Sequence, residues 1–375
     1  MGNPFCYGRV VEGKAFFDRS RIKADIRNVL DGGNNVVLYG PRRYGKSSLV
    51  GEILGGLRSE GVLCAQINLM DVASLDDFIC KYAKVIYREV SPVAGTLKHV
   101  MGLFKRMSPV LGMDAEGRPE LKFEIASVRS GLPALREVLE IPARICPQGK
   151  RIVVAIDEFQ EIGGLGLGVQ FERTMRTVVE SQRNVSYVFL GSKTHLMRRM
   201  FSLKSRPFYN SAQKFELHRP PVEESVAFLV KRFKDAGLTL PAEVAKGMVE
   251  RAGNVPYYLQ ALGSWTFNVV SNRSARKVSE ADVDEGFESL YASERILLEN
   301  TFFGHPASQR VLLQALAQEP TERFDEGYRA RHLLASTSTI NTALKRLMDE
   351  STVEDVDGAY TLVDPLLAYH LKRQT

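Results

Sequence analysis

The chain has 375 residues, of which 44% are hydrophobic and 25% charged, and its formal net charge is +6. This composition is that of an ordinary globular protein and excludes a disordered, collagen-like or disulfide-rich chain. The length predicts about two or three domains, and no apolar run approaches the roughly 20 residues that span a bilayer. The sequence pI near 9.0 permits a nucleic-acid partner without requiring one.

The cysteine pattern points to a reducing compartment. The four cysteines stand at positions 6, 64, 80 and 146, without C-x-x-C spacing and without clustered histidines. Neither a zinc site nor a disulfide framework is therefore expected. We predict a cytoplasmic protein without membrane contact.

The first strong signal along the chain is a phosphate-binding loop. Residues 40–47 read G-P-R-R-Y-G-K-S and fit the pattern G-x-x-x-x-G-K-[ST]. A buried strand over 36–39 and a helix over 48–54 are expected around it, so that backbone N–H groups and the helix N-terminus meet a phosphate. Lys46 is expected to reach the β- and γ-phosphates, and Ser47 to bind Mg²⁺. Gly40 and Gly45 are expected to let the backbone approach the phosphate oxygens.

The expected nucleotide contacts extend over the whole loop. They are Gly40, Pro41, Arg42, Arg43, Tyr44, Gly45, Lys46, Ser47 and Ser48. Two interpretations of the arginine pair stay open at this point. Arg42 and Arg43 contact phosphate or a partner, or they are solvated loop charges.

A second buried strand ends in two carboxylates. Residues 152–156 are five apolar residues in a row, which suits a central parallel strand. Asp157 and Glu158 follow at its C-terminal end, where α/β sheets bind ligands. Asp157 is predicted to hold Mg²⁺ through a water, and Glu158 to deprotonate the attacking water. The pair of carboxylates favours hydrolysis over binding alone.

Strand and helix signals alternate up to about residue 220, which predicts a parallel sheet with right-handed crossovers. The expected strands lie at 36–39, 62–68, 152–157, 185–190 and 214–217, and the expected helices at about 48–54, 74–89 and 170–181. Residues 91–133 interrupt this rhythm with scattered Gly, Pro, Met and Lys. We predict that they form an insertion of mixed helix and loop.

The remaining chain is predicted to be mainly helical. Helices at 222–235, 240–252, 256–268 and 279–291 form a small lid, and the last opens with the capping-box-like pair Ser279 and Asp282. Helices at 309–318, 328–334 and 336–350 then precede two strands at 352–356 and 360–363. This order is that of a winged helix-turn-helix domain. The expected domains are an ATPase core at 1–220, a lid at 221–300 and a winged helix domain at 301–375.

Together these parts resemble the archaeal-type ATPase family, P-loop ATPases near the STAND and AAA+ groups and the replication initiators. The resemblance runs from the segment F-F-D-R at 16–19 to Asp364 and Pro365. The two-arginine loop, the segment D-E-F-Q-E at 157–161 and the segment R-A-G-N-V-P-Y-Y-L at 251–259 carry it. It implies an AAA+-like fold with a five-stranded parallel sheet, and Mg²⁺-dependent binding and hydrolysis of ATP.

The resemblance implies further site residues. Ser192, after a strand, would contact the γ-phosphate or water as a sensor, and Pro256 would pack on the bound nucleotide. Phe17 and Arg19 would lie over the adenine. Arg206 stands where AAA+ relatives hold an arginine finger, which would act on a neighbouring copy in a homo-oligomer.

The chain also departs from the family pattern, and structural alternatives stand beside the implied roles. No arginine occupies the usual second-sensor place, and residues 209–211 read Y-N-S where the family often has Y-G-R. Ser192 could instead cap the next helix, and Pro256 could be a helix N1 residue. The basic residues at 193, 198, 199, 204 and 206 could be an exposed helix face.

The winged unit leaves two kinds of partner open. The third helix begins with Ser336, Thr337, Ser338, Thr339 and Asn341, residue types that contact bases or phosphates, and Lys345 and Arg346 follow. Residues 308–375 nevertheless hold eight Lys and Arg against ten Asp and Glu. This balance is poor for neutralising phosphates, and winged helices also dock proteins.

Two functions follow from these observations. The first is a nucleotide-gated ATPase machine, acting on DNA or on a protein partner held by the winged helix domain or by the insertion. The second is a slow STAND-like switch that binds ATP or ADP without significant turnover and docks a protein partner. The carboxylate pair favours the first, and the missing second-sensor arginine favours the second. ATP and Mg²⁺ are the predicted cofactors of both.

Overall fold

The computed structural model of the protein describes residues 2–11, 13, 19–90, 107–113, 119–125, 131–356 and 358–374. The chain forms two compact units that alternate along the sequence. We call them the sheet unit, Arg19–Tyr39 with Leu49–Glu216, and the helical unit, Met1–Asp18 with Gly40–Ser48 and Leu217–Thr375. Among the described residues, no helix is both long enough and apolar enough to cross a membrane.

The sheet unit is built on the predicted five-stranded parallel sheet. Its strands are β1 (Val36–Tyr39), β2 (Leu63–Asn68), β5 (Ile152–Asp157), β6 (Val185–Gly191) and β7 (Gln213–Glu216), in the spatial order β2-β5-β6-β1-β7. All neighbouring strands are parallel, so their carboxyl ends meet at one edge of the sheet. The residues of β5 and β6 are all buried, as their apolar runs predict.

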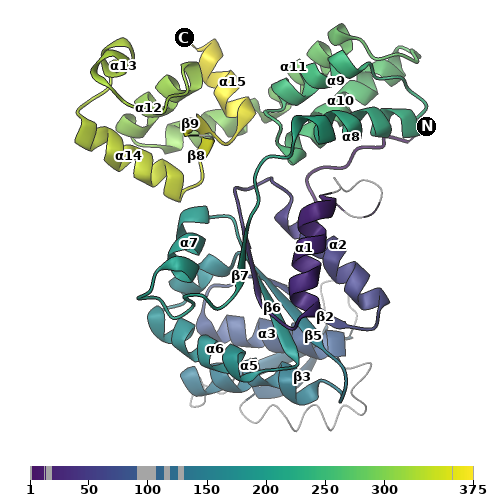
Figure 1. Ribbon diagram of the computed structural model, residues 1–375, viewed down its shortest axis with the longest axis vertical. Coiled ribbons are helices and arrows are strands. Elements are labelled where there is room, and N and C mark those ends of the chain that lie inside the picture. Colours follow the sequence, from purple (N-terminus) through teal and green to yellow (C-terminus); the bar gives the residue numbers. More distant parts are fainter. Residues whose placement is uncertain are drawn as a thin grey trace. The chain divides into compact units, whose positions relative to one another are not determined.

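Helices cover both faces of this sheet. They are α1 (Ser20–Asp31), α2 (Lys46–Ser59), α3 (Leu75–Val90), α5 (Leu132–Ile145), the 3₁₀ helix η3 (Phe159–Gly164), α6 (Val169–Ser181) and α7 (Thr194–Ser202). Figure 1 shows α1 and α2 on one side of the strands and α3, α5 and α6 on the other. Side chains that alternate along the strands therefore enter two separate apolar layers.

The described part of the predicted insertion corrects the expectation of mixed helix and loop. It contains two antiparallel strands, β3 (Met107–Met113) and β4 (Pro119–Ile125). In β4 the apolar residues at 121, 123 and 125 alternate with charged residues at 120, 122 and 124. This two-residue period is the strand signal that the scattered Gly and Pro residues hid.

The helical unit begins its long C-terminal part with the predicted lid helices. These are α8 (Val222–Asp235), α9 (Ala242–Arg251), α10 (Pro256–Asn272) and α11 (Glu280–Gly304). The capping box of Ser279 and Asp282 is present at the start of α11. That helix runs beyond residue 300, where the sequence predicts the boundary to the winged helix domain.

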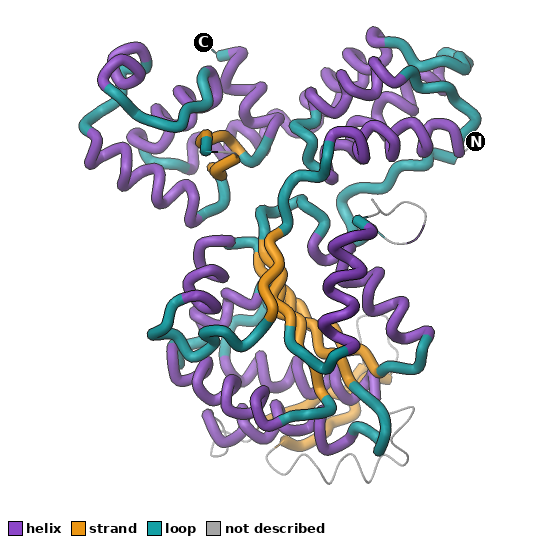
Figure 2. Tube along the Cα trace, in the orientation of Figure 1, coloured by secondary structure: helices purple, strands orange, loops and turns teal. Residues whose placement is uncertain are grey.

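The predicted winged helix order follows. It consists of α12 (Ala307–Gln318), α13 (Glu326–Arg331), α14 (Thr337–Asp349), the antiparallel strands β8 (Val353–Val356) and β9 (Ala359–Leu362), and α15 (Pro365–Arg373). Figure 2 shows this strand pair among the helices of the unit. The sequence did not predict α15, whose N-cap residue Asp364 accepts hydrogen bonds from the N–H groups of Leu366 and Leu367.

Candidate nucleotide-binding site

The phosphate loop links the carboxyl end of β1 to the first turn of α2. Gly45 has a φ of 85° and Arg43 a φ of 69°, both in the left-handed region. Glycine adopts this conformation without strain, whereas an arginine there is uncommon and is held by its surroundings. A Cβ atom at Gly40 would lie 2.5 Å from the carbonyl oxygen of Leu217. A close backbone neighbour therefore already requires glycine at position 40, besides the predicted approach to phosphate.

The ammonium group of Lys46 lies inside this loop. The residue is only 6% exposed, and its Nζ donates to the carbonyl oxygens of Gly40 at 2.7 Å and Pro41 at 2.8 Å. A buried ammonium needs hydrogen-bond partners, and the loop backbone supplies them. The positive charge is thus fixed at the N-terminus of α2, the end of a helix that attracts anions.

The two arginines of the loop differ. Arg42 is exposed, but Arg43 donates from Nη1 to Asp364 Oδ2 at 2.7 Å and to the hydroxyl of Tyr258. That hydroxyl also donates to Asp364, and the Arg43 guanidinium lies over the ring of Tyr257, 4.8 Å from its centre. Burial raises the pKa of Asp364, and the nearby Arg43 opposes this effect. The Arg43 side chain is therefore held by hydrogen bonds and an ion pair and is not a solvated loop charge.

The side chain of Tyr44, the next loop residue, is also held by hydrogen bonds. It is buried, and its hydroxyl donates to Glu354 Oε1 in β8 at 2.6 Å. Arg219 donates to the same hydroxyl at 3.0 Å and to Glu354 at 2.5 Å. Burial is the largest cause that raises the pKa of Tyr44, so the phenol stays a donor.

We call the pairs Arg43–Asp364 and Tyr44–Glu354 the loop–wing contacts, because they join the phosphate loop to the winged helix domain. Sequence reasoning missed them. Asp364 and Tyr258 belong to the segments that carry the family resemblance, but no spacing in the sequence predicted that they contact Arg43.

The N-terminal residues form a further contact with the loop. Asn3 donates from Nδ2 to the hydroxyl of Ser264 in α10 at 2.9 Å, and the N–H of Val11 donates to Ser48 Oγ at 2.9 Å. The segment therefore connects the lid helix α10 with the end of the phosphate loop. The hydroxyl of Ser48, a predicted nucleotide contact, is engaged by the chain itself.

The residues expected around the adenine and the lid lie as follows. Phe17 is outside the described residues, and Arg19 is the N-cap residue of α1. Pro256 is buried at the first turn of α10. This position matches the helix N1 alternative.

The carboxylates after β5 lie in a polar network with Ser192. Asp157 is buried, and its Oδ1 accepts from the N–H of Glu158 at 2.9 Å. Glu158 has a φ of 54°, a strained conformation of the kind found at functional sites. Its Oε2 accepts from Ser192 Oγ at 2.7 Å and from Gln160 Nε2 at 2.6 Å. The predicted base and the predicted sensor residue thus meet in the sheet unit.

The alternative role of Ser192 is wrong. Lys193, not Ser192, is the N-cap residue of α7, and no side-chain hydrogen bond caps that helix. Ser192 is 1% exposed, and its hydroxyl instead donates to the Glu158 carboxylate.

Arg206 forms an ion pair inside its own unit. Its guanidinium binds Glu172, a carboxylate that is 1% exposed. Burial raises the pKa of Glu172, and Arg206 is the first of the groups that oppose the rise. An arginine-finger role on a neighbouring copy would require this pair to open. Arg198 and Lys193 of the same basic stretch are also paired, with Glu216 and Glu161.

We expect Arg206→Ala to lower the free energy of unfolding by about 3 kcal/mol, because it leaves a buried carboxylate without its cation. Chemical denaturation measures this change. The double variant Arg206→Ala with Glu172→Gln should recover part of the loss, since the unpaired charge is then absent. Equal stability of Arg206→Ala and the unmodified protein would contradict the structural role of the pair.

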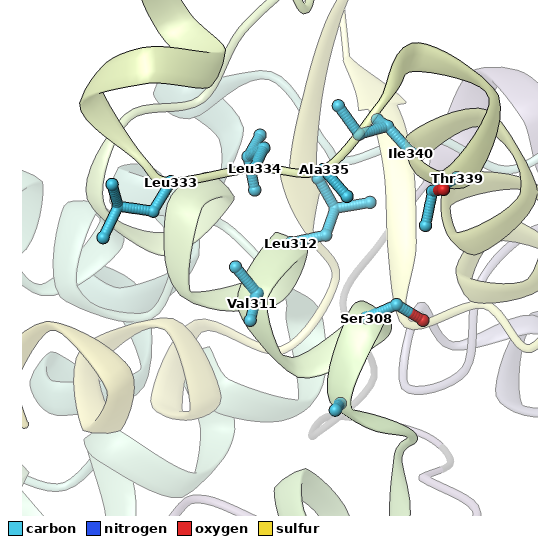
Figure 3. A pocket seen from close by; sticks show the side chains of 9 residues that line it. Ser308, Val311, Leu312, Leu333, Leu334, Ala335, Thr339 and Ile340 are labelled. Carbon is cyan, nitrogen blue, oxygen red and sulfur yellow. The ribbon is translucent and has the colours of Figure 1, made fainter.

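The winged helix domain presents a partly apolar surface. A pocket of about 190 Å³ lies between α12, the turn before α14 and the start of α14. Figure 3 shows Val311 and Leu312 on one side of it and Leu334 and Ile340 on another. Leu333 in this turn is 88% exposed. The side chains that line this pocket are mainly apolar, and none of them carries a charge.

The comparisons with known proteins agree with this architecture. Residues 297–373 match a family model described as a probable winged helix domain. The structure is similar to the Walker-type ATPase PABY2304 of Pyrococcus abyssi, with a TM-score of 0.66 and 19% identity over 96% of this chain and 97% of that chain. It is also similar to the ORC2 protein of Aeropyrum pernix in ADPNP–ADP complexes, with a TM-score of 0.60 and 14% identity over 98% of each chain. A search of the curated proteins finds no match.

Both similarities extend over nearly the whole chain, so they concern the order of sheet, lid and winged helix and not a single motif. The chain therefore shares the overall fold of these two solved structures, with a winged helix domain at residues 297–373.

Proposed function

We propose that the protein is a Mg²⁺-dependent ATPase, whose phosphate loop holds the triphosphate while Glu158 activates the attacking water. The observation that carries this proposal is the buried ammonium of Lys46 inside the loop, at the N-terminus of α2. A fixed positive charge beside backbone N–H groups suits the β- and γ-phosphates. The loop conformation, with Gly45 in the left-handed region, supports the same assignment.

The oxygen groups suit Mg²⁺. Ser47 offers a hydroxyl directly after Lys46, and Asp157 offers a buried carboxylate. Mg²⁺ prefers oxygen ligands and is commonly bound by one or two protein groups together with water and phosphate. Within the described ranges no cluster of three or more His, Cys, Asp or Glu could hold a metal by itself, which fits such a shared site. Bound Mg²⁺ would neutralise charge on the phosphates.

The carboxyl ends of β1 and β5 lie at the same edge of the sheet, because both strands run parallel to β6. The phosphate loop follows β1, Asp157 ends β5, and β6 pairs with both strands. In our proposal Glu158 takes the proton of water and Ser192 assists as the sensor residue. The loop residues, Pro256 and the segment of Phe17 and Arg19 hold the nucleotide.

The larger organisation also belongs to the proposal. We assign residues 1–220 to an ATPase core, 221–300 to a lid and 301–375 to a winged helix domain that receives DNA or a protein. All four cysteines are free thiols, which supports a cytoplasmic location. In a homo-oligomer Arg206 would act as a finger only after leaving Glu172.

The test is release of phosphate from ATP by the full chain, with Mg²⁺ and with EDTA. We expect Mg²⁺-dependent release of phosphate. Duplex DNA forms a second arm of the assay. A higher rate with DNA would identify DNA as the partner, and an unchanged rate favours a protein. No release with Mg²⁺ at any protein concentration would contradict the ATPase proposal.

The loop–wing contacts favour a second candidate function, the slow switch. Asp364 and Glu354 belong to the winged helix domain and engage two neighbouring residues of the phosphate loop. Phosphate groups bound at the loop would compete electrostatically with the Asp364 carboxylate for Arg43. The nucleotide state would then control how firmly the winged helix domain is held, and the domain would transmit that state to a protein partner.

We expect Asp364→Asn to slow dissociation of ADP about tenfold, which corresponds to a gain of about 1.4 kcal/mol in binding free energy, because the phosphates then no longer compete with a carboxylate for Arg43. The amide keeps the shape of the carboxylate but removes the charge that holds Arg43. Stopped-flow displacement of a fluorescent ADP measures the rate. Asp355→Asn serves as the control, because it neutralises a different carboxylate, in β8, whose Oδ1 accepts from the N–H of Gly358. Equal rates for Asp364→Asn and the unmodified protein would contradict the switch.

A further inference from the structure

Gln160 lies between two carboxylates just after β5. We propose that Gln160 is a positioning residue for ATP hydrolysis, whose side-chain amide holds the Glu158 carboxylate in the direction from which it takes a proton from water. This inference rests on the proposed function, because it gives Gln160 a task only if Glu158 is the base.

The contacts of the Gln160 amide carry the inference. Its Nε2 donates to Glu158 Oε2 at 2.6 Å and to Glu161 Oε1 at 3.2 Å. The same Glu158 oxygen accepts from Ser192 Oγ at 2.7 Å and from the Ser192 N–H at 3.3 Å. One carboxylate oxygen is thus held from two sides, by η3 and by the residue that follows β6. Rotation of the carboxylate would break all of these hydrogen bonds.

The orientation of the amide itself is fixed by chemistry. Only the NH₂ end of a glutamine can donate, and both carboxylates accept. The opposite orientation would place the carbonyl oxygen of Gln160 against two negative charges. The amide therefore has one stable direction, with Nε2 toward Glu158 and Glu161.

The orientation of the Gln160 amide leaves its carbonyl oxygen in an unfavourable environment. Gln160 is 5% exposed, and its Oε1 is buried without a hydrogen-bond partner among the described residues. A Cβ atom at Gly191 would lie only 2.6 Å from this oxygen. Glycine at the end of β6 thus provides the space that the amide occupies. A buried acceptor without a partner is unfavourable for stability, and such local costs are typical of functional sites.

A cation completes the network. Lys193 donates from Nζ to Glu161 Oε1 at 2.8 Å, the same oxygen that accepts from Gln160. The charge of Glu161 is thereby compensated, and Gln160 joins two carboxylates without direct repulsion between them. The chain of contacts runs from Lys193 through Glu161 and Gln160 to Glu158.

The proposed step needs a base of fixed direction. A proton of the attacking water moves to Glu158, and the water oxygen bonds to the γ-phosphorus. The bond from that phosphorus to the bridging oxygen breaks, and ADP leaves with the bond electrons. A carboxylate that turns away from the water slows this step, and misplacement by about 1 Å costs on the order of 100-fold in rate.

The test is Gln160→Met, which keeps the length of the side chain and removes both donors. We expect kcat for ATP to fall about 10- to 100-fold, without a comparable change in the dissociation constant for ATP. In the background of Glu158→Gln, the same substitution should lower kcat no further, because Gln160 acts only through Glu158. Gln160→Glu, which keeps the shape but cannot donate when ionised, should show the same pattern.

The matched control is Gln182→Met. Gln182 also makes two hydrogen bonds in the sheet unit, with the Leu139 carbonyl and the Tyr187 hydroxyl, but it lies before the start of β6. Its loss should leave kcat unchanged, and thermal melting shows whether each variant folds. The inference would be overturned if Gln160→Met lowered kcat by the same factor in both backgrounds, or if folded Gln160 variants kept an unchanged kcat. Either result would leave the proposed function intact. Absence of turnover in the unmodified protein would instead overturn the proposed function and this inference with it.

Discussion

Replacement of Glu158 by glutamine is expected to lower the rate of ATP turnover by about 100-fold or more, while the protein still binds ATP. The amide oxygen of a glutamine can accept the hydrogen bonds that Ser192 and Gln160 donate to the carboxylate. The geometry of the network is therefore retained, but the group can no longer accept a proton from water. Phosphate release measures turnover, and calorimetric titration with ATP measures binding.

Glu180→Gln provides the control for the loss of one carboxylate. Glu180 lies near the end of α6 and pairs with Arg176 on its own helix, so its loss should not change turnover. Unchanged turnover in Glu158→Gln would place the base at another residue. Loss of ATP binding in the same variant would show that Glu158 serves binding and not proton transfer.

The sheet and the winged helix were predictable because their signals are local. The apolar runs of β5 and β6 are long enough to identify buried strands, and the phosphate-loop pattern fixes the strand before it and the helix after it. The three helices and two strands after residue 306 follow each other with short turns. Each of these elements could be recognised without knowledge of its neighbours.

Helices α5 and α1 were missed, as α15 was, and the reasons for these two lie in their sequences. Helix α5 contains Pro142 in its interior, and a proline there argues against a helix because it removes a backbone donor. Helix α1 buries only Ile26 and Leu30 completely, so its apolar face is narrow. Tertiary packing stabilises both helices where local propensity does not.

The contacts of the phosphate loop could not be predicted from local patterns at all. Arg43 and Asp364 are separated by 321 positions, and Tyr44 and Glu354 by 310. No spacing rule connects residues at such distances, because only the fold brings them together. For this reason the sequence left Arg43 open between a ligand contact and a solvated charge. The Glu158 network is different, since Gln160 stands two positions away and only its orientation required the structure.

Replacement of Lys46 by methionine is expected to weaken ATP binding by about 100-fold or more, while the fold survives. Methionine keeps most of the apolar stem and removes the ammonium that the loop encloses. A hydrogen bond to a charged group contributes about 1.5 to 3 kcal/mol, and each 1.4 kcal/mol changes the dissociation constant about tenfold. Because the triphosphate also loses a direct ionic partner, the upper part of this range applies.

Calorimetric titration with ATP and Mg²⁺ measures the loss, and thermal melting without nucleotide tests the fold. Lys246→Met, which removes an exposed lysine from α9, controls for the change in net charge. Removal of the Lys46 ammonium also leaves the carbonyl groups of Gly40 and Pro41 without this donor. A small decrease in melting temperature is therefore compatible with the assignment. Unchanged affinity for ATP is not, because the ammonium would then lie inside the loop without serving the phosphates.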